Sequence, residues 1–155
     1  MANDAIALLK KDHANVKALF DEICNLGDRA SASRAKLFQK IAQELDLHTR
    51  VEETIFYPAV KEAAKRDPEA RDLVLEAFTE HALVKTLIAD IQSLESADEN
   101  YRPKISVLVE MVLQHIQEEE KELFPHVKRI CDQGQLREMG DQILEMKEQA
   151  GAPVR

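Results

Sequence analysis

The sequence predicts an all-α fold: an antiparallel up-down-up-down four-helix bundle with a short C-terminal helix. Apolar residues recur every three or four positions over long stretches, and almost no segment alternates as a strand does. The chain has 155 residues, 45% of them hydrophobic, so it is long enough to bury one core. Helices joined by short loops pack most simply as antiparallel neighbours. We therefore expect a single domain over residues 1–155, with helices at about 4–26, 33–64, 68–96, 102–131 and 134–149.

The first two predicted helices have recognisable end signals. Asn3 is the candidate N-cap of the first helix, and Gly27 is its stop. Ser33 is the candidate N-cap of the second helix, which Pro58 should kink or end. The inward-facing positions of these helices are expected to be Ile6, Leu9, His13, Val16, Phe20 and Ile23, followed by Leu37, Ile41, Leu45, His48, Glu52, Ile55 and Ala59.

The other three helices follow from similar signals. Asp67 before Pro68 predicts the start of the third helix, which should fade near Ser96. The fourth helix should start around residues 102–103 and carry Pro125 late in its pattern. The inward positions of the third helix are expected to be Val74, Ala77 or Phe78, His81, Val84, Ile88 and Ile91. Those of the fourth helix are Ile105, Leu108, Val112, His115, Glu119 and Leu123. Those of the fifth helix are Leu136, Met139, Ile143 and Met146.

A duplicated motif lies on these inward stripes. The segment from His48 to Pro58 is echoed 67 residues later, and each copy has a His and a Glu four positions apart, which is one turn on one helix face. Two further histidines occur in the similar contexts Asp-His-Ala-Asn-Val-Lys, at His13, and Glu-His-Ala-Leu-Val-Lys, at His81. The pattern is typical of one metal-binding helical hairpin that has been duplicated.

Antiparallel packing should bring four imidazoles and two carboxylates into one layer inside the bundle. Burying Glu52 and Glu119 without partners would be prohibitive, and no Lys or Arg shares the inward stripes at that depth. We therefore favour a metal pair over a buried polar network. Six nitrogen and oxygen ligands in two matching sets suit two octahedral iron ions better than a closed zinc site, with manganese or zinc as substitutes.

These elements, in this order and spacing, strongly resemble the haemerythrin-like, or HHE cation-binding, domains over nearly the whole chain. The resemblance rests on Asp12-His13, His48 through Pro58, Glu80-His81 and His115 through Pro125. It implies a four-helix bundle with an oxo- or hydroxo-bridged di-iron centre in which Glu52 and Glu119 bridge the irons. The ligands it implies are His13, His48, Glu52, His81, His115 and Glu119.

One departure from the oxygen-carrying members of that family bears on function. They have a second His one turn from the ligand on the third helix, whereas Ala77 and Lys85 flank His81 here. Two octahedral ions offer about twelve coordination positions, of which the implied ligands and bridges fill about ten. A vacancy on each metal indicates a site that reacts with oxygen, peroxide or nitric oxide rather than a dedicated oxygen carrier.

The leading hypothesis is thus a small cytoplasmic non-haem di-iron protein that binds O2 or NO for sensing, storage or protection. The enzymatic alternative is a peroxide- or NO-consuming di-iron oxidoreductase with Tyr57 or Glu53 as proton donor, and a third hypothesis is an iron donor or iron-sensing module. The net charge of −8 and the lack of a Lys/Arg cluster disfavour a nucleic-acid partner. No stretch of about 18 apolar residues suggests a membrane span, and Cys24 and Cys131 form no pattern of a secreted disulfide framework.

Several residues near the motif are assigned simpler roles. Glu53 and Glu120 are expected on a solvated helix face, with orientation of the histidines or control of ligand entry as the alternative. Tyr57 is expected to pack the bundle, with a hydrogen bond to the metal site as the alternative. His126 lies about 16 Å along the helix from His115 and is expected at the surface at one end of the bundle. Cys24 should lie at the opposite end of the bundle from Cys131, which disfavours a disulfide between them.

Overall fold

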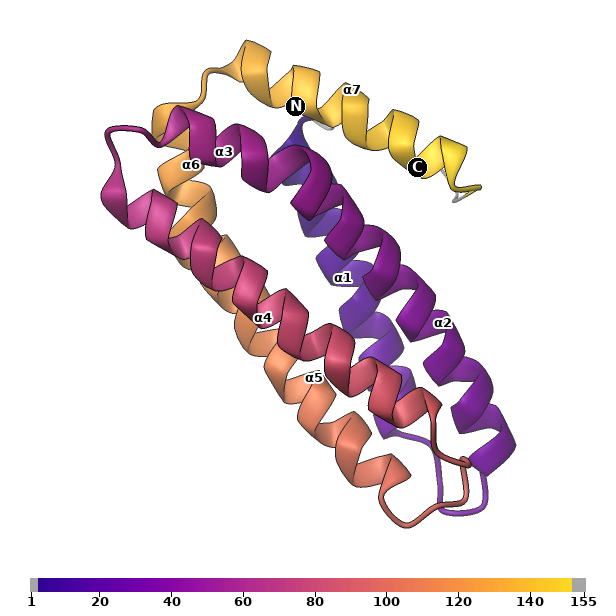
Figure 1. The fold of residues 1–155 in the computed structure, drawn as a ribbon. Helices are drawn as coiled ribbons and strands as arrows, with labels where there is room; N and C mark the ends of the chain where they lie inside the picture. The colour runs from indigo at the N-terminus through magenta and orange to yellow at the C-terminus, as the bar shows by residue number, and fades with distance from the viewer. Residues whose placement is uncertain (1–2, 152–155) are drawn as a thin grey trace.

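The computed structural model describes residues 3–151 and consists of four long antiparallel helices with a further helix across one end of the bundle (Figure 1). The long helices are α1 (Ala5–Cys24), α2 (Ser31–Val51), α4 (Pro68–Gln92) and α5 (Tyr101–Glu118). Consecutive helices run in opposite directions, so the predicted up-down-up-down bundle is confirmed. In this described part of the chain, we find no helix with the length and apolar character that a membrane span requires.

Helices α2 and α5 each continue through one wide turn into a short helix. Helix α2 passes through η1 (Glu52–Phe56) into α3 (Tyr57–Ala63), and α5 passes through η2 (Glu119–Leu123) into α6 (Phe124–Ile130). The two turns occupy the same place in the duplicated motif. Each begins at the glutamate of the His-x-x-x-Glu pair, so the candidate ligands lie where the helix geometry changes.

The wide turns are of the π type and lie just ahead of the two prolines. In η1 the N–H of Tyr57 donates to the carbonyl of Glu52, five residues earlier, and η2 contains the equivalent bond. In an α-helix the proline ring would clash with the carbonyl four residues before it, and the extra residue in the turn relieves that crowding. Pro58 therefore does not end the helix, which continues to Ala63.

The π turn changes which residues of this segment face the core. The regular pattern predicted Ile55 and Ala59, but both are only partly buried, and Phe56, Tyr57 and Val60 are fully buried instead. The prediction for these positions was wrong by one residue, because the extra residue in η1 turns the following helical positions about the helix axis.

Two of the predicted N-caps were also displaced. Asp4, rather than Asn3, caps α1, and its side chain accepts a hydrogen bond of 2.8 Å from the N–H of Ala7. Ser33 lies inside α2, which begins at Ser31 without a side-chain cap. The fold tolerates the missing cap because an amphipathic helix takes most of its stability from packing.

The start of α4 agrees with its prediction. Asp67 caps the helix by accepting from the N–H of Ala70 at 3.1 Å, and Pro68 occupies the first turn. The helix ends at Gln92, four residues before the predicted Ser96, and α5 starts at Tyr101, one residue before the predicted start. The exact ends of helices are the feature that sequence patterns define least well.

The apolar core is divided into two clusters by a polar layer. One cluster contains the first turns of α1 together with α3, α6 and the C-terminal helix, and the other contains the opposite halves of the four long helices. Buried polar residues lie between them, including four histidines and two glutamates. The bundle therefore encloses its polar groups at mid-depth, with apolar packing on both sides.

The C-terminal helix α7 (Gln133–Gln149) packs mainly on α1 and also contacts α2 and η1. A capping box between Asp132 and Gln135 starts it. Gly140 lies against the backbone of Asn3, where an added Cβ would come within 1.9 Å of the Asn3 carbonyl oxygen. Only glycine permits this close approach, which fixes α7 on the start of α1.

Candidate metal centre

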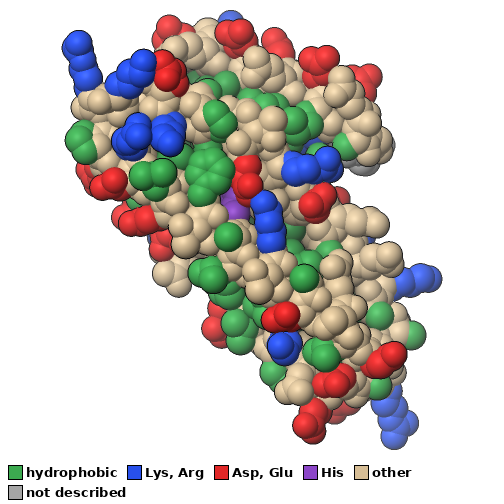
Figure 2. All heavy atoms as spheres, viewed as in Figure 1, with side chains coloured by type: hydrophobic (Ala, Val, Ile, Leu, Met, Phe, Trp, Pro, Cys, Tyr) green, Lys and Arg blue, Asp and Glu red, His purple; other side chains and the backbone are tan. Residues whose placement is uncertain are grey.

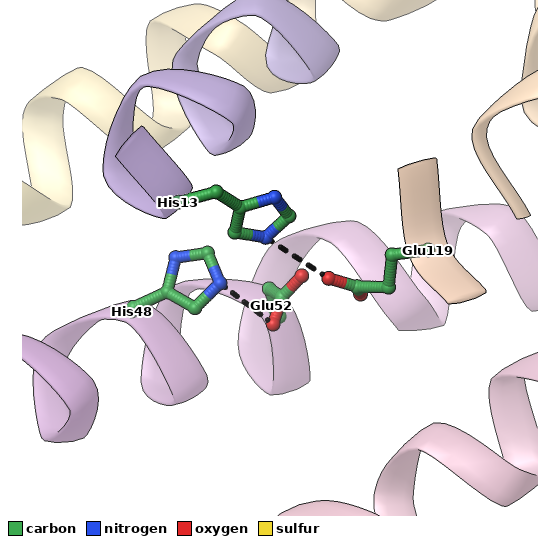
Figure 3. A group of neighbouring side chains, drawn as sticks. All are labelled: His13, His48, Glu52 and Glu119. Atoms are coloured by element: carbon green, nitrogen blue, oxygen red, sulfur yellow. Dashed lines mark ion pairs between the residues drawn. The ribbon is translucent and has the colours of Figure 1, made fainter. Parts of the chain in front are cut away.

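All six residues predicted to bind metal are buried in the polar layer. His13 lies on α1 and His81 on α4. In each copy of the duplicated motif, the histidine lies near the end of a long helix and the glutamate is the first residue of the π turn that follows it. Figure 3 shows His13, His48, Glu52 and Glu119 with their polar ends pointing toward one another from three different segments of the chain. The structure thus brings the six together, and their role as metal ligands remains a prediction.

The six residues form two overlapping groups. The donor atoms within each group all lie within 4.8 Å of one another, and the groups are His13, His48, Glu52 and Glu119, and Glu52, His81 and His115. Glu52 belongs to both, because its Oε1 is 3.1 Å from Nε2 of His48 and 3.2 Å from Nε2 of His81. It is therefore placed to bridge two cations.

Glu119 has the corresponding position in the second copy of the motif. Its Oε1 lies 3.1 Å from Nε2 of His13 and 3.5 Å from Nε2 of His115. Each carboxylate thus contacts the histidine of its own helix and a histidine of the other half of the chain. The arrangement has the approximate two-fold symmetry that the duplicated sequence leads one to expect.

The donor set fits a metal because several of its atoms are otherwise unsatisfied. Among the described residues, the buried side-chain atoms without a hydrogen-bond partner are His13 Nε2, His48 Nε2, Glu52 Oε1, Glu52 Oε2 and Glu119 Oε1. These atoms approach one another closely but do not align as hydrogen bonds. Each unsatisfied buried group costs about 1–3 kcal/mol, more when charged. Two divalent cations at this position would satisfy them all.

The Nδ1 atom of every histidine in the layer is paired with a further carboxylate. The Nδ1 atoms lie 2.6–2.9 Å from carboxylate oxygens in the pairs His13–Glu120, His48–Asp12, His81–Glu53 and His115–Glu80. A carboxylate at Nδ1 fixes the ring and leaves Nε2 free to coordinate a cation. The expectation that Glu53 and Glu120 lie on a solvated face was therefore wrong, because histidines from other helices reach them.

The carboxylates also control protonation in the absence of a metal. Burial disfavours a charged His48, but the carboxylates of Glu52 and Asp12 outweigh it and hold the pKa of His48 well above its usual value. Burial likewise opposes protonation of His115, yet Glu119 and Glu80 raise its pKa to about 9. Both shifts favour the doubly protonated, positively charged imidazole in the metal-free protein, and a metal that binds Nε2 must displace the proton on that nitrogen.

The two glutamates of the layer do not titrate alike. Burial opposes ionisation of Glu52, but the positive charge of His48 beside it outweighs burial and holds the pKa of Glu52 well below its usual value. Burial and the nearby charge of Glu52 raise the pKa of Glu119. Of the pair, Glu119 is the carboxylate that accepts a proton first.

Tyr57 is the site residue whose position the sequence pattern missed. Its hydroxyl donates to Oε2 of Glu119 at 2.5 Å and lies 3.2 Å from Nε2 of His81 and 3.4 Å from Nε2 of His115. Burial, together with Glu119 and Glu52, raises the pKa of Tyr57 well above its usual value. The tyrosine is thus a neutral hydrogen-bond donor in the metal-free site, which was the alternative role considered for it.

Replacing Tyr57 with Phe should lower the free energy of unfolding of the metal-free protein by about 1.5–3 kcal/mol, because a carboxyl oxygen loses its buried donor. Urea unfolding in a chelating buffer would measure the change. Tyr101→Phe is the control, since Tyr101 packs against Phe38 in the other apolar cluster. Equal losses in the two variants would show that the Tyr57 hydroxyl has no special role.

A small enclosed cavity lies against the histidines. It has a volume of about 20 Å³ and is lined by the four imidazoles and by Val16, Leu45, Thr49, Val84, Val112 and Ile116. This is room for one water-sized molecule. Thr49 is the one hydroxyl in the wall, and it already donates to the carbonyl of Asp46. The cavity therefore suits a small apolar molecule better than a strongly hydrogen-bonding one.

The cavity is separated from solvent by a thin wall. Leu45, Thr49 and Val84 line both the cavity and an open surface groove between α2 and α4. Figure 2 shows this face of the bundle, with one histidine side chain visible near its middle beside acidic and basic groups. Lys85 lines the same groove and forms an ion pair of 2.8 Å with Glu53. The groove therefore lies on the other side of these three residues from the histidines.

The remaining candidate residues lie away from the centre. His126 is partly buried and bonds to Asp67 at 3.0 Å through Nδ1, so it belongs to an ion-pair cluster that also includes Arg129. Cys24 is exposed at the end of α1, and Cys131 is buried beneath α7, and neither is paired.

Comparison with known proteins agrees with this geometry. The family model described as the Hemerythrin HHE cation binding domain matches residues 4–127, which contain all six candidate ligands. A crystal structure of a hemerythrin HHE cation-binding domain protein from Mycobacterium kansasii is similar to this chain with a TM-score of 0.79 and 25% identity, covering 96% of this chain and 88% of that one.

Two curated proteins show how far the similarity extends along the chain. An uncharacterized protein of Mycobacterium tuberculosis is 26% identical over 153 residues, which are 97% of this chain and 90% of that protein. An uncharacterized hemerythrin-like protein of Schizosaccharomyces pombe is 27% identical over 119 residues, which are 77% of this chain. The match spans only 57% of the length of the fission-yeast protein.

Proposed function

Because the chain belongs to the hemerythrin HHE cation-binding family, we propose that it is a non-haem di-iron protein that binds O2 or NO, for sensing, storage or protection. The six-residue layer supplies a buried site able to hold metal cations. His13, His48, His81 and His115 would hold the two metals, and Glu52 and Glu119 would bridge them. When bound, iron would contribute Lewis-acid and redox chemistry that the side chains themselves lack.

The observation that carries this proposal is the apolar cavity beside the four imidazoles. Apart from the imidazoles, its walls are aliphatic except at Thr49, whose hydroxyl already donates to the carbonyl of Asp46. Such a space favours an uncharged diatomic molecule. The carboxylates at the Nδ1 atoms keep the Nε2 atoms directed toward the site.

The direct test is metal analysis of anaerobically purified protein, followed by absorption spectra before and after exposure to air or NO. We expect two irons per chain and reversible spectral changes without turnover. Zinc alone, or substoichiometric metal with no spectral response, would contradict the proposal.

The buried hydroxyl of Tyr57 favours a second candidate function, the consumption of peroxide. A donor that bonds to Glu119 at 2.5 Å is positioned to supply a proton within the site, whereas Glu53 is engaged by His81 and Lys85. Steady O2 evolution from added peroxide, lost in Tyr57→Phe, would favour the enzyme over the binding protein.

Filling the cavity should separate ligand binding from metal binding. We expect Val84→Phe to retain two metals but to weaken the binding of NO by at least tenfold, at a cost in stability of about 1–3 kcal/mol from overpacking. Leu83→Phe is the matched control, because Leu83 is 57% exposed on the same helix. Unchanged NO affinity in Val84→Phe, measured spectroscopically, would mean that the ligand binds elsewhere.

A further inference from the structure

Helix α7 contributes one side chain to the surroundings of the metal centre. Nζ of Lys147 contacts Oδ1 of Asp12, and their side chains are only 12% and 11% exposed. The other oxygen of Asp12 lies 2.9 Å from Nδ1 of His48, and Nε2 of His48 lies 3.1 Å from Oε1 of Glu52. An unbroken chain of polar contacts therefore runs from the C-terminal helix into the layer of candidate ligands.

Lys147 lies outside the part of the chain that matches the family model. The match ends at residue 127, and α7 begins at Gln133. The four long helices and the two π turns, η1 and η2, supply the candidate ligands and the carboxylate that pairs with the Nδ1 atom of each histidine. The ammonium group that contacts Asp12 comes instead from α7, the helix that follows the matched region.

Of the two equivalent carboxylates, Asp12 and Glu80, only Asp12 is paired with a lysine in the described structure. Asp12 precedes His13 as Glu80 precedes His81, and Glu80 bonds to His115 as Asp12 bonds to His48. In the described structure, the ion pair of Glu80 is with His115 and includes no lysine. The charged neighbour of Glu80 is instead another carboxyl group, that of Glu118.

The lysine that pairs with a carboxylate in the other half of the centre is more exposed. Lys85 pairs with Glu53, which bonds to His81, but the Lys85 side chain is 48% exposed. Lys147 is largely enclosed, so its position depends on how α7 is docked. That docking is well defined, since Leu136, Met139 and Ile143 are buried and Gly140 lies against Asn3.

We propose that Lys147 is a positioning residue that couples the docking of α7 to the His13–His48 half of the metal centre. The inference rests on the proposed metal binding by the six-residue layer. Lys147 fixes the Asp12 carboxylate, Asp12 orients the His48 ring, and the ring direction decides how well Nε2 meets a metal. Coupling of this kind is reciprocal, so a bound metal also holds α7 in place.

The first test compares the release of iron from Lys147→Met with that from the wild type. Each protein is loaded anaerobically with Fe(II) and mixed with a competing chelator. We expect one of the two irons to leave about tenfold faster in the variant, the lower end of effects seen for groups behind metal ligands, and the other iron to be unaffected. Lys147→Arg should restore slow release, and Arg137→Met, an exposed position on the same helix, should behave like the wild type.

The second test needs no variant. Hydrogen exchange of the amides of residues 133–149 should slow when Fe(II) is added to the wild-type protein. Unchanged exchange, together with equal release rates in Lys147→Met and the wild type, would overturn the coupling while leaving the metal site intact. A wild-type protein that binds no metal would instead overturn the proposed function, and this inference with it.

Discussion

Glu52→Gln should abolish binding of at least one of the two metals and remove most of the stabilisation that metal confers. The amide cannot serve as an anionic bridge, and Glu52 is the residue shared by both groups of donor atoms. At a metal concentration of about 100 times Kd, one bound metal stabilises by about 2.7 kcal/mol, which corresponds to about 5–10 °C in Tm for a chain of this size. That increment should be absent in the variant.

The change is measured by elemental analysis and by thermal unfolding with and without metal. Comparing each protein with its own metal-free form isolates the contribution of the metal from any change in the apo structure. Glu62→Gln is the control, because Glu62 is a glutamate of the same continuous helix whose side chain is 73% exposed. Two metals per chain in Glu52→Gln would show that Glu52 is not a bridge.

The metal-free protein should lose stability as the pH rises from about 6.5 to about 9. A histidine whose folded pKa is raised stabilises the fold fully below its unfolded pKa, and this contribution is lost as the pH rises through the folded value. For His115 the difference is about 9 minus the ordinary 6.5. At 1.36 kcal/mol per pKa unit this is at most about 3.4 kcal/mol, and His48 acts in the same direction.

Metal binding should depend on pH in the opposite direction, since the metal competes with protons for the imidazoles and its affinity rises with pH. Urea unfolding at pH 6.5, 7.5 and 9, with and without metal, would show both trends. His115→Gln should flatten the slope of the metal-free protein. A metal-free stability that does not change across this range in the wild type would refute the protonated state assigned to His48 and His115.

The bundle and the positions of the six site residues could be predicted from the sequence because they depend on local geometry. A histidine and a glutamate four residues apart share one helix face wherever that helix packs. The inward stripes of α1 and of α5 with η2 were correct for the same reason, and their predicted members are all buried. Because the motif is duplicated, the sequence also predicted that the donor residues of the two halves would be arranged in equivalent ways.

The surroundings of those residues were decided by the tertiary structure. Tyr57 lies five residues after Glu52, which in a regular α-helix would point it about 140° away, and only the π turn brings its hydroxyl to the site. Glu53 and Glu120 are of the same residue type as the solvated glutamates around them. What distinguishes them is the approach of His81 and His13 from other helices.

Lys147 is the extreme case, because 135 residues separate it from Asp12. Periodicity reports which face of a helix is buried, and spacing reports which side chains share that face. Neither carries information on which face of another helix will lie opposite. The sequence by itself therefore determined the helices and the inward donor set, whereas the partners of those donors depended on long-range packing, which only the folded chain defines.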